Sequence, residues 1–122
     1  MDAFENLDVW KRSSRLCVEL YQALAKCRDS GFKDQITRAA LSVPSNIAEG
    51  CERDSRREYV RFLRIAKGSC GELRTQLYIG AEIGHLSREV MKTLVSEARD
   101  VSRMLHGLIR SLVAAEDADR GA

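Results

Sequence analysis

Glu82 and His85 are the residues whose types and spacing best fit metal chemistry, because Glu-x-x-His places two ligands on one helix face in di-metal helical bundles. Such a site needs a second pair of this kind and two more inward carboxylates. The other histidine, His106, has Arg103 three residues before it. The sequence also has no zinc-ligand spacing and no Gly-rich phosphate loop. We therefore expect no metal site, no cofactor and no catalytic residues, and we predict that the protein is not an enzyme.

Basic side chains recur at the helical period in two segments and could contact phosphates. They are Arg57, Arg61, Arg64 and Lys67 in the first segment, and Arg99, Arg103, His106 and Arg110 in the second. Stripes of this kind can follow the backbone of RNA or DNA and bind it without sequence preference. The alternative is a solvated face balanced by nearby acidic residues, which are Glu58, Glu72, Glu97 and Asp100.

A third group of residues is unfavourable for helices. Pro44 lies within a continuous apolar helical pattern, and Gly68 and Gly71 lie in the middle of the next one. Pro costs roughly 3 kcal/mol inside a helix, and Gly about 1 kcal/mol relative to Ala. We interpret these residues, with Asn46 and Gly50, as a packing and assembly signature. In this interpretation the small residues let the Pro44 region of the preceding helix approach closely, and the alternative is a contact with a subunit or partner.

Four segments with apolar residues at steps of three and four must position these side chains. They predict helices over about residues 8–28, 33–52, 56–83 and 88–115. The second pattern passes through Pro44 in phase, which favours one kinked helix over a new helix starting at Pro44. Gly31 and Gly84 are expected to end the first and third helices, and Ser55 and Ser87 to cap the third and fourth.

These segments predict an all-α fold, an antiparallel up-down-up-down four-helix bundle over residues 1–115. Residues 116–122 are polar and are predicted to be a frayed tail. Phe4, Leu7 and Trp10 lie ahead of the first apolar stripe or beside it. We consider two roles for these three residues, an apolar lip for a neighbouring subunit or packing within the chain.

Composition limits the classes of partner and the compartment. The chain has 20 basic and 18 acidic residues among its 122, a balance too even to predict a polyanionic partner by itself. The four cysteines show no C-x-x-C pairing, which favours reduced thiols over metal ligands or disulfides. The first residues do not read as a secretory signal, and the apolar runs are too short for a membrane span. We therefore expect a cytoplasmic protein with no membrane partner.

Several motifs act together as a signature: FENLDVWK at 4–11, QITRAA at 35–40, SVPSNIAEG at 42–50 and FLRIAKGS at 62–69. In combination they resemble the four-helix-bundle family of bacterial proteins encoded in intervening sequences of 23S rRNA genes. The accessory variability determinants of diversity-generating retroelements are relatives of that family. The resemblance implies a small cytosolic protein that assembles as a homopentamer. In the retroelement relatives, it implies a basic barrel that binds nucleic acid and a reverse transcriptase.

Two functions follow as expectations. The first is a non-enzymatic oligomeric protein that binds RNA, DNA or a nucleoprotein, with Arg57, Arg61, Arg64 and Lys67 as the contacts. The second is a structural or protein-interaction scaffold with an unknown protein partner and no nucleic-acid binding.

Overall fold

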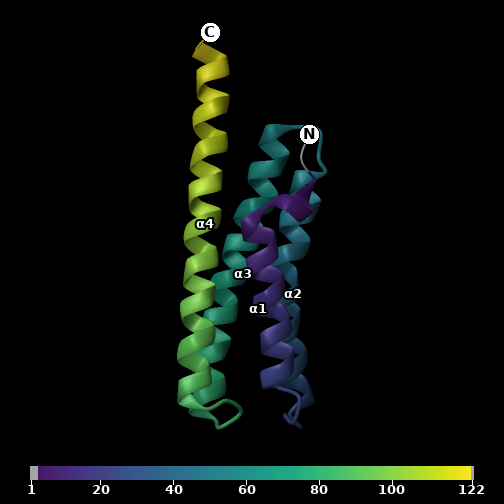
Figure 1. The fold of residues 1–122 in the computed structure, drawn as a ribbon, viewed down its shortest axis with the longest axis vertical. Helices are drawn as coiled ribbons and strands as arrows, with labels where there is room; N and C mark the ends of the chain where they lie inside the picture. Colours follow the sequence, from purple (N-terminus) through teal and green to yellow (C-terminus); the bar gives the residue numbers. More distant parts are fainter. Residues whose placement is uncertain (1–2, 122) are drawn as a thin grey trace.

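Four long helices follow a short 3-10 turn in the structure, a computed structural model that describes residues 3–121 (Figure 1). The turn, η1, is Phe4–Asn6. The helices are α1 (Asp8–Ala23), α2 (Ser30–Cys51), α3 (Arg56–Glu82) and α4 (Arg88–Gly121). The described residues contain no β-strand, so the fold is all-α as predicted.

Each helix packs against two others. The most extensive contact joins α2 and α3, followed by α3 with α4, α1 with α2, and α1 with α4. Within residues 3–121, the diagonal pairs α1–α3 and α2–α4 make no close backbone contact. Figure 1 places the α1–α2 and α3–α4 connections at one end of the molecule and the α2–α3 connection at the other. This is the arrangement of a four-helix bundle.

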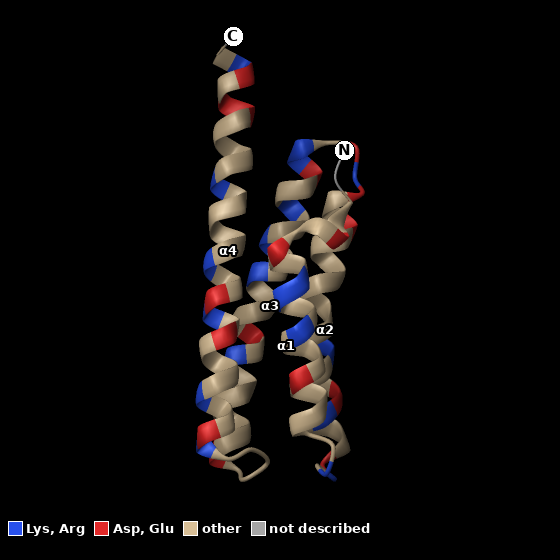
Figure 2. Ribbon diagram, in the orientation of Figure 1, with Lys and Arg blue, Asp and Glu red and all other residues tan. Residues whose placement is uncertain are grey.

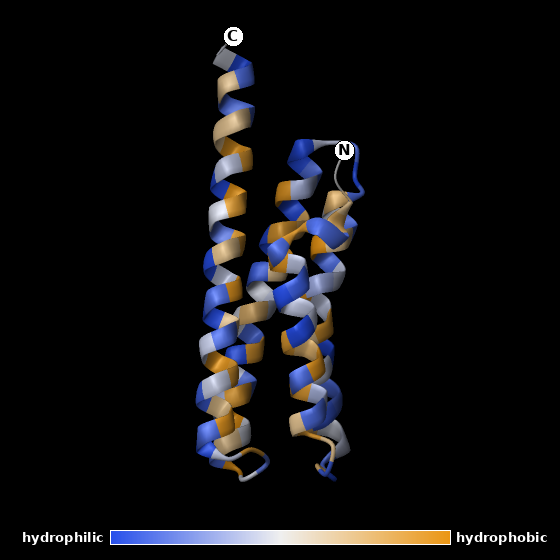
Figure 3. Ribbon diagram, in the orientation of Figure 1, coloured by the Kyte–Doolittle hydropathy of each residue, from blue (hydrophilic) through white to orange (hydrophobic). Residues whose placement is uncertain are grey.

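The core is a column of aliphatic side chains supplied by all four helices. Leu20, Ile47, Leu73 and Leu105 are completely buried, one from each helix. Figure 3 shows hydrophobic segments alternating with hydrophilic ones along every helix. Burying each such side chain contributes about 1.5–3 kcal/mol. None of the helices in the described part of the chain has both the length and the apolar content needed to cross a membrane.

The ends of the first two helices differ from the prediction. Helix α1 ends at Ala23 and not at residue 28, and Gly31 lies in the first turn of α2 and does not terminate α1. Asp29 accounts for the early start of α2, because its carboxylate accepts a hydrogen bond from Phe32 N at 3.1 Å and caps the helix. Among the described glycines only Gly84 has a positive φ, 87°, and it follows the end of α3 as predicted.

The predicted polar tail is helical through Gly121, while Ala122 lies outside the described residues. Arg56, the first residue of α3, donates to Asp119 Oδ2 at 2.6 Å and lies 3.5 Å from Glu116 Oε2. Glu116 and Asp119, whose polarity led to the prediction of a frayed tail, instead form ion pairs between the end of α4 and the start of α3. Figure 1 shows this end of α4 projecting beyond the other helices.

Helix α2 runs through Pro44 as one helix, and a bend there stays a prediction. Pro44 is buried, and Asn46 Nδ2 donates back to the Ser42 carbonyl at 2.8 Å. The Ser42 hydroxyl also lies 2.9 Å from that of Ser69 on α3. The SVPSN segment therefore contributes a polar link between α2 and α3 as well as apolar packing.

Glycines allow close approaches between α2 and α3 at Gly50 and at Gly80, where an added Cβ would lie 2.7 Å from Phe32 Cζ, and the expectation that Gly68 and Gly71 provide one is wrong. A Cβ added to Gly50 would lie 2.8 Å from Phe62 Cβ, whereas one added to Gly68 or Gly71 would meet nothing within 4 Å. The physical reason is rotation, because the buried face of α3 is carried by the neighbouring residues Ala66 and Cys70. A subunit contact at Gly68 and Gly71 stays a prediction.

The three residues considered as an apolar lip pack within the chain. Phe4 and Trp10 meet edge to face with ring centroids 5.2 Å apart. Leu7 and Trp10 are partly buried against the core. A further contact of these residues with a second subunit stays a prediction.

Candidate nucleic-acid interface

Helices α3 and α4 border a continuous groove on the outside of the bundle. It consists of three hollows of about 1140, 540 and 420 Å³, and neighbouring hollows share lining residues. We call it the α3/α4 groove. Its basic and histidine side chains are Arg56, Arg57, Arg61, Arg64, Lys67 and Arg74 from α3, and Arg99, Arg103, His106, Arg110 and Arg120 from α4. Figure 2 shows basic segments along both helices.

The groove brings together the two basic stripes seen in the sequence. Lys67 Nζ lies 3.2 Å from His106 Nδ1, so the stripe on α3 meets the stripe on α4 at this point. An ammonium group only donates hydrogen bonds, so His106 Nδ1 is the acceptor in this contact. All four of the residues proposed as contacts, Arg57, Arg61, Arg64 and Lys67, line the same groove.

Acidic side chains offset part of the positive charge in the part of the groove near the start of α3, where five arginines line the hollow with three carboxylates. Arg61 pairs with Glu58 at 2.9 Å, and its guanidinium lies 4.4 Å from the centre of the Phe62 ring. The Arg61 hydrogen bond lowers the pKa of Glu58. Glu116 and Asp117 also line this part. Here the alternative of a solvated face with paired charges describes the surface around Glu58 and Arg61.

The opposite end of the groove has no acidic lining. This hollow, which we call the cationic pocket, is formed by Lys67, Arg74, Arg99, Ser102, Arg103 and His106. Arg99 Nη2 donates to the Tyr78 hydroxyl at 3.0 Å, and Arg103 Nη1 donates to Asp100 Oδ1 at 2.9 Å. The pocket thus gathers four permanent cations from two helices.

Arg74 belongs to this pocket, although it was not among the predicted contacts. It follows Lys67 by seven residues, which is two helical turns, so it continues the same stripe. Gly71 lies between them and interrupts the basic pattern. The sequence could have indicated Arg74 through its seven-residue spacing from Lys67, despite the glycine between them.

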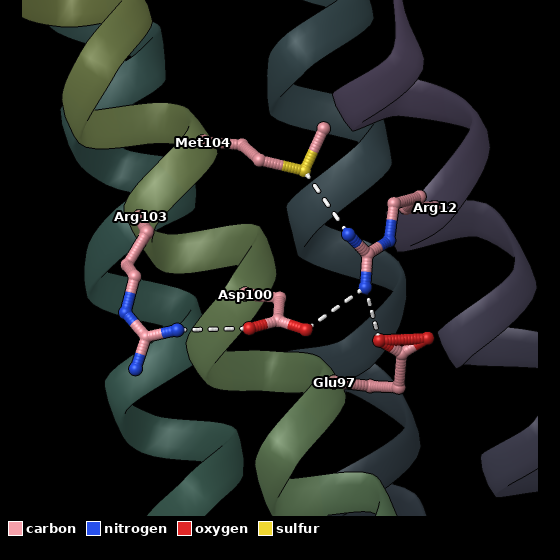
Figure 4. Close-up of polar contacts among 5 residues, drawn as sticks. All are labelled: Arg12, Glu97, Asp100, Arg103 and Met104. Carbon is pink, nitrogen blue, oxygen red and sulfur yellow. Dashed lines mark hydrogen bonds and ion pairs between the residues drawn. The ribbon is translucent and has the colours of Figure 1, made fainter.

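Two acidic residues expected to balance the α4 stripe, Glu97 and Asp100, are engaged by α1. Figure 4 shows both carboxylates pointing toward Arg12 of α1, with Asp100 placed between Arg12 and Arg103. Arg12 Nη2 donates to Asp100 Oδ2 at 3.1 Å and also pairs with Glu97. The hydrogen bonds that Arg12 donates to Glu97 and then to Asp100 raise the pKa of Arg12. This interhelical cluster occupies the carboxylates and leaves the lining of the pocket basic.

Glu82 and His85 do not act as a pair, because each contacts a charged residue at the start of another helix or just before it. His85 Nε2 lies 2.9 Å from Asp29 Oδ2, and Glu82 lies 3.8 Å from Arg88. The hydrogen bond with His85, and then that from Phe32 N, lower the pKa of Asp29. Within residues 3–121, no three His, Cys, Asp or Glu side chains gather as a metal site would require.

The four cysteines are free thiols, and two of them, Cys17 and Cys70, are buried. Burial raises the pKa of Cys70 to about 11, which keeps this thiol protonated at neutral pH. Burial also raises the pKa of Cys17. These two thiols therefore act as small core side chains.

Comparison with known proteins places the chain in a family. The sequence model of the 23S rRNA-intervening sequence protein matches residues 5–107. The chain belongs to the 23S rRNA-intervening sequence protein family. The match spans the first three helices and the part of α4 that lines the cationic pocket.

A solved structure has the same fold as this member of the 23S rRNA-intervening sequence protein family. It is a protein with unknown function from the S23 ribosomal protein family of Bacteroides thetaiotaomicron VPI-5482, with a TM-score of 0.78 and 20% sequence identity. The similarity covers 84% of this chain and 95% of that one. A search of curated proteins found no match. Family membership confirms the resemblance drawn from the motifs, while the relation to retroelement determinants stays a prediction.

Proposed function

We propose that this protein is a non-enzymatic RNA-binding protein that holds the phosphate backbone along the α3/α4 groove. The observation that carries the proposal is the meeting of two basic stripes across one groove, at a pocket lined by four Lys or Arg side chains and no carboxylate. The family name records a position within 23S rRNA genes and names no ligand, so the choice of RNA over DNA is part of this proposal.

The composition of the groove supports backbone contacts over base recognition. Its lining side chains are basic, acidic, small polar or aliphatic, and none is aromatic except His106. Base stacking on single strands needs exposed aromatic faces. From Arg57 to Arg74 the groove extends about 25 Å along α3, long enough to contact several phosphates. We therefore propose binding that depends on salt and is independent of sequence.

The proposal includes a cytoplasmic homopentamer of antiparallel up-down-up-down bundles, and kinship with the retroelement determinants. Large apolar side chains left exposed by the chain support self-association: Leu41 is 52% exposed, Ile79 50% and Ile83 55%. Mass measurement in solution tests this part, and a monomer at high protein concentration contradicts it.

The RNA-binding proposal is tested by charge reversal with a matched control. Arg64 and Arg99 are exposed residues of the groove, one from each helix. Lys11 and Arg38 are exposed on α1 and α2 and line none of the three hollows of the groove. Both double variants, R64E/R99E and K11E/R38E, remove the same charge from the protein.

Binding to a short single-stranded RNA is measured by fluorescence anisotropy at low salt. We expect R64E/R99E to weaken binding by about tenfold or more, because each phosphate contact is electrostatic. K11E/R38E should change it much less. Equal loss in both variants would show that net charge alone matters. No binding by the unmodified protein would favour the protein-interaction scaffold, for which the exposed apolar residues Leu41, Ile79 and Ile83 argue.

A further inference from the structure

We propose that the cationic pocket binds a phosphomonoester, the terminal phosphate of an RNA strand that lies in the α3/α4 groove. The inference rests on the proposed function, because bound RNA brings its end to the pocket. It adds that the pocket distinguishes a chain end from the interior of the strand.

The pocket is a convergent site, unlike the rest of the groove. Its volume of about 420 Å³ lies within the range of small-ligand sites. The side chains come from both helices, so they surround a ligand from two sides. Ser102 adds a neutral hydroxyl donor. The other two hollows include acidic lining residues and would repel a dianion more strongly.

Two of the four cations in the pocket are held by neutral partners, and a third makes no ion pair within residues 3–121. Arg99 is oriented by the Tyr78 hydroxyl, and Lys67 by His106. Arg74 makes no ion pair within residues 3–121, and its Nε is buried without a hydrogen-bond partner. The positive charges of Lys67, Arg74 and Arg99 are therefore not neutralised by a carboxylate. An anion that reaches the pocket finds charge-assisted donors, which form the stronger class of hydrogen bond.

The fourth cation, Arg103, is the one with an acidic partner. Asp100 accepts from Arg103 through Oδ1 and from Arg12 through Oδ2, as Figure 4 shows. Asp100 thus shares its single negative charge between two arginines. It orients Arg103 without lining the pocket itself.

Gly71 keeps the α3 side of the pocket open. It lies one helical turn from both Lys67 and Arg74, and a Cβ at this position would meet nothing within 4 Å. A larger side chain here would project between the two cations. Gly71 is therefore explained by access to the pocket, since packing inside the chain does not require a glycine at this position.

The charge of the pocket favours a phosphate monoester over a diester. A backbone phosphodiester carries one negative charge, whereas a phosphate monoester carries about 1.5 to 2 at neutral pH. Four cations with one shared carboxylate can neutralise the dianion. The planar guanidinium groups also match phosphate oxygens in pairs.

The test uses one RNA sequence in three forms: with a 5′-phosphate, with a 3′-phosphate, and with hydroxyls at both ends. We expect the full-length protein to bind a phosphorylated form about tenfold more tightly than the hydroxyl form, the gain expected from charge-assisted hydrogen bonds. The two phosphorylated forms identify which end is recognised. Inorganic phosphate, added as a competitor, tests whether a free phosphate occupies the same pocket.

Variants distinguish the pocket from the rest of the groove. R74Q and, separately, R99Q should abolish the preference for the phosphorylated form, and R99Q is an exposed change that keeps the test valid if R74Q does not fold. R57Q/R61Q, at the other end of the groove, should weaken all three forms equally. Equal binding of all three RNA forms by the unmodified protein would contradict the proposal that the pocket recognises a terminal phosphate, and would leave the RNA-binding proposal in place. Absence of any RNA binding would contradict the proposed function and the pocket together.

Discussion

At the residue scale, the glycines of α2 and α3 show what a residue type can and cannot indicate. The sequence identified Gly68 and Gly71 as costly for a helix, and predicted close packing. Close contacts lie instead at Gly50, against Phe62 and Tyr59, and at Gly80, against Phe32. A glycine is unfavourable on any side of a helix, so its presence does not reveal which side is crowded. That depends on the rotation of α3, which the packing of the whole bundle determines.

Two Gly-to-Ala changes should therefore have opposite effects on stability. Gly50→Ala is expected to cost about 1–3 kcal/mol, because the added methyl overpacks the contact between α2 and α3. Gly68→Ala is expected to stabilise by about 0.4–1 kcal/mol, because it restricts the unfolded chain and meets no neighbour. Urea unfolding of both variants measures the difference. Destabilisation of similar size in both would contradict this account.

The Asp29 carboxylate predicts a pH dependence of stability. Hydrogen bonds with His85 and Phe32 N lower the pKa of Asp29 below its ordinary value of 3.8. Its charged form thus stabilises the fold above that pH. The contribution is lost progressively as the pH falls from 3.8 through the lowered pKa of the folded state.

Thermal unfolding between neutral pH and pH 2 tests this with Asp29→Asn as the comparison, since Asn keeps a side-chain cap but carries no charge. We expect the difference in Tm between the two proteins to shrink as the pH falls below about 4. A constant difference across the range would exclude Asp29 as a source of the pH dependence.

At the element scale, the sequence predicted the number of helices and their buried faces, because the apolar period of each segment is clear. The seam of α4 is an example, with Leu94, Ala98, Val101 and Leu105 all buried. The length of α4 was underestimated, because its apolar pattern stops at Ala115. The extension is paired with Arg56, a residue of another helix, and no local pattern in α4 records this contact.

Removing Arg56 should therefore loosen only the end of α4. In Arg56→Ala we expect faster amide hydrogen exchange over residues 113–120, because Glu116 and Asp119 lose their partner on α3. Exchange in the buried turn around Leu105 should stay unchanged. Arg57→Ala is the matched control, because Arg57 forms no ion pair within the described residues. The same loosening in both variants would contradict a specific role for Arg56.

At the scale of the whole molecule, the sequence contained both basic stripes, but their meeting in one groove is a property of the fold. Each stripe follows from the helical period of its own segment. Their mutual orientation depends on how α3 and α4 rotate to bury their apolar faces. The ion pairs of Glu97 and Asp100 with Arg12 on α1 depend on tertiary structure in the same way. For this reason the sequence alone could not exclude the alternative that acidic residues balance the basic stripe of α4.

The salt dependence of RNA binding tests the central claim most directly, that the α3/α4 groove holds the phosphate backbone. The logarithm of the binding constant should fall linearly with the logarithm of salt concentration, with a slope of about −0.7 for each phosphate contacted on a single strand. We expect R64E/R99E to have a shallower slope than the unmodified protein, by about 1.4 if each arginine neutralises one phosphate. K11E/R38E should keep the original slope. Binding that is insensitive to salt, or an unchanged slope in R64E/R99E, would contradict the account.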